Sequence, residues 1–398
     1  MTGTTGTTGT AIPLVLMRGG TSKGVFVTDD ALPGPGPERD RALLALLGSP
    51  DPMQLDGLGG THSSTSKVVL VRPSEHPGCD IDYLFVQVGI ERPIVDYAGN
   101  CGNLTAAAAV YALQEGLLAG DARPGLVRMF NRNVGQRIDA VVPAPHPLGD
   151  WREEARGAGM PTTGLAVLTE YLDPSGPVTG ALLPTGEPRD VLAPSVGDPI
   201  EVSIVDLAAP IVFVRAADLG LRGDEAPATL NAAPGLLARL ESIRAAGAAR
   251  IGLAADEAEA AVRSPVLPRL TIVSPPPEAS RTAPGAGVAA QEGPGAADLV
   301  VRATSLGRAH HACPITTALC AAAAARTAGT LPFAYARRGD PGSVRITHPK
   351  GALTVTVRTS DGTNREDGTN PEDGGEIVSV GVLRTARRLL AGTAYLPG

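Results

Sequence analysis

The stretch from Asp96 to Thr105 carries the clearest chemical signal of the sequence, because glycines surround a single cysteine directly before an alanine-rich run. Gly102 and Asn103 tolerate the backbone conformations of a tight strand-to-helix turn. A thiol at the mouth of a helix, here Cys101, lies beside unpaired N–H groups and the positive end of the helix dipole, which favour a thiolate or a bound anion. The alternative is a small buried cysteine with no function. We predict an acid/base or anion-binding centre at Cys101.

Lysine is rare in this chain. Lysine and arginine together number 34, yet lysine occurs only at Lys23, Lys67 and Lys350. Two of the three close the same tripeptide, Thr21-Ser22-Lys23 and Thr65-Ser66-Lys67. A desolvated lysine can lose its proton, whereas arginine effectively cannot. We therefore predict that at least one of these two lysines exchanges a proton.

Two glycine-rich loops carry the paired tripeptides and need strands to hold them. The first loop, 18–24, joins strands predicted over 11–17 and 25–27, and it lacks the spacing of a nucleotide-binding P-loop. The second loop, 56–67, leads into a strand predicted over 68–71. Loops rich in backbone N–H groups, hydroxyls and cations suit a carboxylate.

The two halves of the chain repeat one motif. Counting from Cys101 and from Cys313, threonine follows at +4 and alanine at +5, and each time an alanine-rich helix follows. One such entry per half predicts a duplicated domain with two helix N-termini facing one cleft. We place the domain boundary at 185–197, which gives an N-terminal domain over 11–190 and a C-terminal domain over 191–398.

Other elements complete the second half. We predict one helix over 230–246, a linker at 275–296 and an exposed insertion at 360–375, which is rich in Asp, Gly and Thr. A final strand is predicted over 376–383 and a short terminal helix over 384–390.

Composition excludes several classes of partner. The 398 residues are 43% hydrophobic and 19% charged, with a net charge of −7 and no basic run, so nucleic acid and anionic membranes are poor partners. No apolar run is long enough to cross a bilayer, and the threonine- and glycine-rich start has no signal-peptide pattern. The four scattered cysteines indicate reduced thiols in a cytoplasm. A homodimer is the expected assembly.

These residues allow a proton-transfer site that needs no cofactor. Loop N–H groups, helix ends and cations would hold a substrate with several carboxylates, and one group would remove a proton next to a conjugated carbonyl. The candidate bases are Lys67 and Cys101, and the candidate relays or partners are Ser22, Ser66 and Cys313. Residues predicted to bind substrate are Arg18, Gly19, Thr21, Lys23, Ser64, Ser66, Asn100, Gly102, Asn103, His311 and Thr316.

Two other site chemistries fit the sequence less well. His310, His311 and Cys313 cluster, but their spacing matches no standard zinc pattern, so no metal is expected. No G-x-S-x-G elbow of a serine hydrolase occurs.

At these residues the chain resembles the PrpF family, whose members isomerise 2-methylaconitate and related acids and share the fold of diaminopimelate epimerase. The matching stretches run in order over most of the chain: 17–24, 48–51, 56–60, 64–68, 99–103, 183–186 and the helix entry at His311-Ala312. The resemblance implies an α+β fold of two similar domains, each a mixed β-sheet wrapped around a central helix. It also implies an active site between the domains and no cofactor.

By this resemblance Ser22, Lys67 and Cys101 fall on the active-site positions of the family. Cys313 falls roughly where the epimerases have a second cysteine. The resemblance implies a double-bond isomerase for small unsaturated carboxylic acids, such as aconitate-type tri-acids. Three rivals stay open: a double-bond isomerase of a secondary-metabolite pathway, a racemase or epimerase with paired thiols, and a non-catalytic protein that assists an aconitase-like enzyme.

Overall fold

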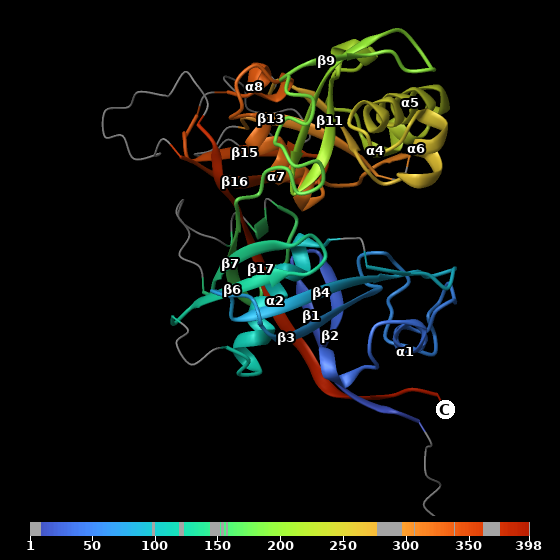
Figure 1. Cartoon of the computed structure of the whole chain (residues 1–398), viewed down its shortest axis with the longest axis vertical. Helices are drawn as coiled ribbons and strands as arrows, with labels where there is room; N and C mark the ends of the chain where they lie inside the picture. The colour runs from blue at the N-terminus through green and yellow to red at the C-terminus, as the bar shows by residue number, and fades with distance from the viewer. Residues whose placement is uncertain are drawn as a thin grey trace, which may run out of the picture. The chain divides into compact units, whose positions relative to one another are not determined.

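The computed structural model describes residues 9–97, 100–118, 123–143, 152, 155–156, 158–276, 297–305, 307–337, 339–360 and 375–397. The chain divides into two compact units (Figure 1). Unit 1 comprises Met1–Arg156, Met160–Glu170 and Leu383–Gly398, and unit 2 comprises Gly157–Gly159 and Tyr171–Val382. The predicted boundary at 185–197 is therefore wrong in two respects. The chain passes into unit 2 at Tyr171, before the predicted boundary, and it returns to unit 1 at Leu383.

In the described residues, unit 1 is a mixed sheet that has a helix packed against each face. Its strands are β1 (Ala11–Gly19), β2 (Ser22–Thr28), β3 (Lys67–Pro73), β4 (Ile81–Val88), β5 (Val95–Asp96), β6 (Leu126–Asn131) and β7 (Gln136–Val141). Its helices are α1 (Pro37–Leu47), α2 (Gly102–Gln114) and the 3-10 turn η1 (Asp29–Ala31). Two strands, β8 (Leu165–Leu172) and β17 (Ile377–Tyr395), contain the points where the chain passes from one unit to the other.

Alternation along the strands decides which helix each side chain meets, because successive residues of a strand point to opposite faces. One face of β1 to β4 packs on the apolar side of α1, as in the cluster of Leu14, Val25, Val68 and Leu43. The other face packs on α2, where the ring of Phe26 lies 5.5 Å from that of Tyr111. The alanines of α2 are fully buried, since their small side chains let the helix approach the sheet closely.

Unit 2 is built in the same way. Its strands are β9 (Asp190–Leu192), β10 (Ile200–Leu207), β11 (Ala209–Arg215), β12 (Arg269–Ser274), β13 (Leu299–Ser305), β14 (Arg308–Ala309), β15 (Ser343–His348) and β16 (Gly351–Thr359). Its helices are α4 (Pro227–Asn231), α5 (Pro234–Arg250), α6 (Glu257–Arg263), α7 (Ile315–Ala324), α8 (Leu331–Tyr335) and the 3-10 turn η2 (Ala217–Leu219). Helix α7 is buried along its whole length, whereas α2 is buried except at Asn103 and its last two residues, and α5 packs on the opposite side of the sheet through Leu240 and Ile243.

The order of strand pairing repeats between the units. From β1 to β7 the successive pairs β1–β2, β2–β3, β3–β4, β4–β6 and β6–β7 are antiparallel, parallel, antiparallel, parallel and antiparallel. The pairs β10–β11, β11–β12, β12–β13, β13–β15 and β15–β16 follow the same order. In each unit the buried helix lies between the fourth strand of this series and the fifth. This common topology makes β3 the counterpart of β12, and α2 the counterpart of α7.

Several sequence predictions need correction. Residues 384–390 form no helix, because β17 continues through them as a strand paired with β1. The helix predicted over 230–246 is two helices, α4 and α5, since Pro234 begins the second one. The linker at 275–296 and the insertion at 360–375 fall mostly outside the described residues. Among the described helices, none has the length and apolarity to span a membrane.

Candidate active site

Cys101 and Ser22 come together at the start of α2. Cys101 is the N-cap of this helix, in an extended conformation, and its side chain makes no capping hydrogen bond. The thiol lies 3.9 Å from the hydroxyl of Ser22, the first residue of β2. The first N–H groups of a helix have no acceptor within the helix, and here they belong to Gly102 and Asn103. The thiol, the hydroxyl and these N–H groups therefore lie together at the positive end of α2.

Lys67 lies on the same face and at the same end of the sheet. It is the first residue of β3, and β2 and β3 are parallel with Val25 opposite Val68, so Gly24 lies beside Lys67. Lys67, Gly24 and Ser22 therefore share the face that packs on α2. The Lys67 side chain is only 9% exposed, and its ammonium lies 4.7 Å from the centre of the Phe85 ring. The structure thus brings together three of the four residues that the sequence put forward as catalytic.

Gly24 leaves the space that this arrangement requires. A Cβ at position 24 would lie 2.7 Å from the Leu104 side chain and 3.5 Å from the Cβ of Lys67. The side chain of any larger residue would therefore collide first with Leu104 of α2.

The turn between β1 and β2 fits directly against α2. A Cβ on Gly19 would lie 2.2 Å from the carbonyl oxygen of Asn103, and Gly20 has φ 50°, in the left-handed region. The Asn103 side-chain amide donates to the Thr21 hydroxyl over 3.2 Å. Gly19 is thus a packing residue, while Thr21 and Asn103 lie next to the start of α2 and keep exposed polar groups there.

Arg18 and Lys23 belong to the opposite face. They pair with each other across β1 and β2, one position out of phase with Ser22 and Gly24. The Arg18 guanidinium donates to the carbonyl oxygens of Gly20 and Thr385, to the Thr385 hydroxyl and to the carbonyl oxygen of Thr163. Burial, and then the nearby Arg387, lower the pKa of Arg18. These contacts give Arg18 a structural role, and its role in binding substrate stays a prediction.

The two predicted site serines in the loop before β3, Ser64 and Ser66, have different hydrogen-bond partners. Ser66 is fully buried, donates to the carbonyl oxygen of Val88 and accepts from the Gln54 side chain, so its hydroxyl holds the loop rather than facing α2. The hydroxyl of Ser64 lies 2.9 Å from Nδ1 of His62, and the Ser64 carbonyl accepts the backbone N–H of Lys23. Both serines therefore order the loops on which Lys23 and Lys67 lie.

Asparagine side chains connect the segment before Cys101 to the sheet. Asn131 donates to the side-chain oxygen of Asn100 over 3.1 Å. Asn133 accepts from the N–H of Phe85 and donates to the carbonyl oxygens of Phe85 and Tyr97. The network therefore links the residue before Cys101 to the strand that carries the aromatic ring beside Lys67.

A second cluster of polar residues surrounds the start of α7 in unit 2. Thr316, in the first turn, accepts a hydrogen bond of 2.5 Å from the Arg269 guanidinium. Cys313 is 7% exposed, and its thiol lies 3.5 Å from the carbonyl oxygen of Pro314. Pro314 is the N-cap of α7, so Cys313 lies one residue further from the helix than Cys101 does. The two cysteines do not hold identical positions.

Four cationic or titratable side chains belong to this cluster. His310 and His311 stack with ring centres 4.5 Å apart, and Nδ1 of His310 accepts the N–H of Ala312. Burial lowers the pKa of His310 to about 4; His311, Arg269 and Lys350 lower it further, while the Ala312 hydrogen bond opposes the shift. His310 is therefore neutral at neutral pH. Lys350, the third lysine of the chain, also lies near this cluster. The rarity of lysine in the sequence was the signal that could have identified it.

Counterpart positions in the two units carry different cations. Lys67 is the first residue of β3, and Arg269 is the first residue of β12, the counterpart strand. An amine can be neutral and take up a proton, whereas a guanidinium stays charged and binds carboxylates in a bidentate manner. The two counterpart positions therefore differ in chemistry, because Lys67 can exchange a proton and Arg269 can bind an anion.

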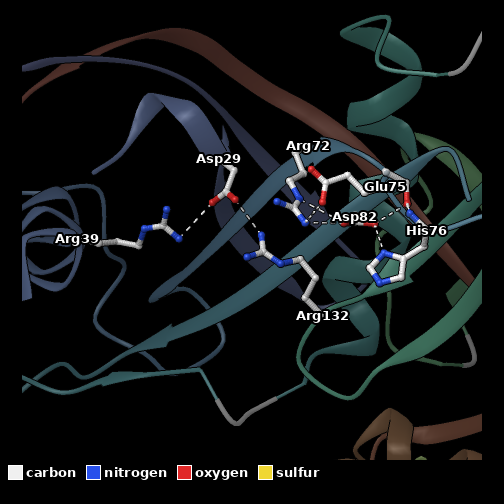
Figure 2. Close-up of polar contacts among 8 residues, drawn as sticks. Asp29, Arg39, Arg72, Glu75, His76, Asp82 and Arg132 are labelled. Atoms are coloured by element: carbon white, nitrogen blue, oxygen red, sulfur yellow. Dashed lines mark hydrogen bonds and ion pairs between the residues drawn. The ribbon is translucent and has the colours of Figure 1, made fainter. Parts of the chain in front are cut away.

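A charged cluster fixes the far end of the hairpin that begins with Lys67 (Figure 2). The buried Asp82 accepts from Arg72, Ser74 and His76. Burial alone would raise the pKa of the Asp82 carboxyl, but the hydrogen bonds from these three residues outweigh it and the net pKa is lowered. Among the described residues, no group of three or more His, Cys, Asp and Glu side chains could hold a metal ion.

Sequence reasoning missed Phe85 and Gln87, which contact Lys67 from β4. They lie on a strand with no motif of its own. Only the pairing of β3 with β4, which aligns Lys67 with Gln87, could have identified them.

The chain is similar to known proteins over nearly its whole length. The family described as PrpF protein matches residues 10–397. The chain is 37% identical to the 3-methylitaconate isomerase of Eubacterium barkeri over 97% of both chains. It is 41% identical to the 2-methyl-aconitate isomerase of Shewanella oneidensis over 85% of this chain and 87% of the other.

Solved structures extend the comparison to the fold. The crystal structure of methylitaconate-delta-isomerase has a TM-score of 0.75 at 36% identity and covers 97% of this chain and 96% of its own. A hydroxyproline epimerase from Agrobacterium vitis has a TM-score of 0.51 at 12% identity, over 98% of this chain and 94% of its own, and shows a similarity of fold alone.

Proposed function

The chain belongs to the PrpF family, and from that premise we propose that it is a cofactor-independent isomerase of small unsaturated polycarboxylic acids. The reaction moves a proton, and with it a C=C bond, within one molecule. The names of its relatives support this class of reaction. The observation that carries the proposal is the position of Lys67 on the same face and at the same end of one sheet as the Ser22–Cys101 pair.

The proposed reaction is balanced within the substrate. The neutral amine of Lys67 takes a proton from a carbon next to the double bond, and the electron pair of that C–H bond spreads into the conjugated carboxylate. A proton then returns to the far carbon of the allylic system, and the double bond takes its new place. Cys101, with Ser22 at 3.9 Å, is the proposed donor for this second transfer. The Lys67 ammonium then returns a proton to the Cys101 thiolate, directly or through solvent, so that both groups regain their starting forms. No oxidant or reductant is required.

Substrate carboxylates require donors, and unit 1 offers them at α2. We propose that the N–H groups of Gly102 and Asn103 and the hydroxyl of Thr21 bind one carboxylate, because a helix N-terminus favours negative charge. In unit 2, we propose the same role for Arg269 and the first turn of α7, with His311 and Thr316.

The test is solvent exchange in deuterated water, followed by proton NMR with aconitate-type and itaconate-type acids. We expect deuterium at an allylic position of at least one of these acids. Lys67→Ala and Lys67→Arg should both lower the rate by about 10²-fold or more, the range for a lost general base. The arginine variant is the informative control, because it keeps the positive charge but cannot act as a base.

Three outcomes separate the rivals. Exchange that survives in Lys67→Arg would show that Lys67 only binds the substrate. Exchange of a proton at a saturated stereocentre, with inversion, would indicate an epimerase. Binding of an acid that raises the melting temperature without any exchange by the wild-type protein would indicate a non-catalytic binding protein.

A further inference from the structure

Lys67 has two defined neighbours besides the residues proposed to act on the substrate. Its Nζ donates to Oε1 of Gln87 over 2.9 Å, and the Phe85 ring lies beneath it at 4.7 Å. Gln87 and Phe85 are both on β4, and in the antiparallel pairing Lys67 lies directly opposite Gln87. Phe85 is the diagonal neighbour on the same face.

The orientation of the Gln87 amide is fixed by its other contacts. Its Nε2 donates to the carbonyl oxygen of Ser66 over 2.8 Å and to that of Ser63 over 3.1 Å. An amide nitrogen has two hydrogens, and both are used here. Oε1 must therefore face the lysine, because a flipped amide would place its nitrogen against the amine and its oxygen against two carbonyl oxygens.

The register of the hairpin keeps this pair opposed. The pairing runs without a bulge from Lys67 and Gln87 to Pro73 and Ile81. Near its far end, Arg72 and Asp82 also lie opposite each other and are held by hydrogen bonds of 3.0–3.2 Å (Figure 2). A slip of one residue would move Gln87 to the other face of the sheet and break both contacts.

We infer that Gln87 is a positioning residue, which holds the Lys67 amine through both halves of the proton transfer. A neutral amine and an ammonium both carry N–H groups, so Oε1 accepts from Lys67 before and after it takes the proton. The amide is neutral, so it aims the amine without trapping the proton as a carboxylate would. The face of the Phe85 ring favours the charged form that follows. This inference rests on the proposed function.

Two variants test the inference. Gln87→Glu and Gln87→Met both lose the donors to Ser66 and Ser63, so both loosen the loop, and the carboxylate also repels the two carbonyl oxygens. They differ at the lysine, because the carboxylate favours an ammonium and the thioether offers it almost no acceptor. We expect the acidic limb of the kcat profile to move up by about 1 pH unit in the first variant and down in the second, with KM changed far less than kcat.

A second readout does not depend on turnover. With ¹⁵N-labelled lysine the protein gives three side-chain Nζ signals, for Lys23, Lys67 and Lys350, and Lys67→Arg assigns the Lys67 signal. Its titration should shift in opposite directions in the two Gln87 variants. If the wild type turns over no acid, the proposed function fails, whereas opposite shifts would still support the contact.

Gln54→Leu is the matched control, because Gln54 also holds the loop before Lys67 through Ser66. Gln54 donates to the Ser66 hydroxyl and accepts from the N–H of Thr61, and among the described residues its side chain makes no hydrogen bond to Lys67. Its loss should lower stability and leave both the pH profile and the Lys67 signal where they are in the wild type. Shifts of the same sign in both Gln87 variants, or none in either, would reduce Gln87 to a purely structural residue.

Discussion

A Cβ at position 20 would lie 2.2 Å from Oδ1 of Asn103, so the turn and the helix fit together only because Gly20 has no side chain. The contact holds the Asn103 amide at the hydroxyl of Thr21, next to the first N–H groups of α2. The turn of β1 and β2 and the start of α2 are therefore one assembly, although some 80 residues separate them in the sequence.

Gly20→Ala should disturb this assembly more than the strain of its backbone explains. The left-handed φ costs about 1 kcal/mol for alanine, and the collision with Asn103 adds to that cost. We expect a total loss of about 2–3 kcal/mol of unfolding free energy and a large fall in kcat/KM, measured by denaturant unfolding and steady-state kinetics.

Gly116→Ala provides the comparison for that prediction. Gly116 has a similar φ of 67°, and a Cβ there would meet nothing within 4 Å. Equal losses of stability in the two variants would show that the Asn103 contact contributes nothing.

The two cysteines should respond differently to replacement by serine. Cys101 is the N-cap of α2 and contacts Ser22, whereas Cys313 lies one residue outside α7 and contacts the carbonyl oxygen of Pro314. We expect Cys101→Ser to lower the rate of deuterium incorporation by about 10²-fold or more. Cys313→Ser should retain incorporation within a few-fold. Loss of activity in both variants would instead favour an epimerase that uses paired thiols.

Acid should destabilise unit 2 through His310. Its pKa is about 4 in the folded protein against 6.5 as the ordinary value. Between these two pH values the unfolded chain binds more protons than the folded protein, so the unfolding free energy falls as the pH is lowered from 6.5 to 4. The loss caused by His310 is complete below pH 4. The slope is at most about 1.4 kcal/mol per pH unit.

His310→Gln isolates this contribution, because glutamine does not titrate. The variant should show a flatter fall in unfolding free energy over the same window, measured by urea denaturation at pH 7, 6, 5 and 4. The lowered pKa of Asp82 also causes a loss of unfolding free energy in acid. That loss should appear only nearer pH 4 and below, and it should be the same in both proteins. An unchanged slope between pH 6.5 and 4 would contradict the assignment.

The sequence predicted the local parts of the site and missed what depends on strand pairing. Cys101 and the buried helix α2 follow from neighbouring residues, namely glycines at a turn and alanines behind it. Ser66 was grouped with Lys67 because they are adjacent, but β3 begins at Lys67 and adjacent residues at its start point in opposite directions. Arg18 was grouped with the loop at α2 in the same way, whereas the phase of β1 places it on the opposite face of the sheet.

The elements show the same division between local and long-range information. Residues 384–390 resemble a helix when considered alone, yet they pair with β1, which lies more than 350 residues earlier. Such pairing outweighs local propensity, because backbone groups buried in a sheet must find partners. Gln87 and Phe85 could not be identified for a related reason. Their role depends on their position opposite Lys67 in the β3–β4 hairpin.

The return of β17 to unit 1 has a consequence for synthesis on the ribosome. β1 pairs with β17 from Ala11 opposite Tyr395 to Gly19 opposite Ala386, so the first strand to leave the ribosome waits for residues made after all of unit 2. Domains usually fold in the order in which they are made. Here unit 2 can finish first, and until then unit 1 exposes an open strand edge that a chaperone or a neighbouring nascent chain could occupy.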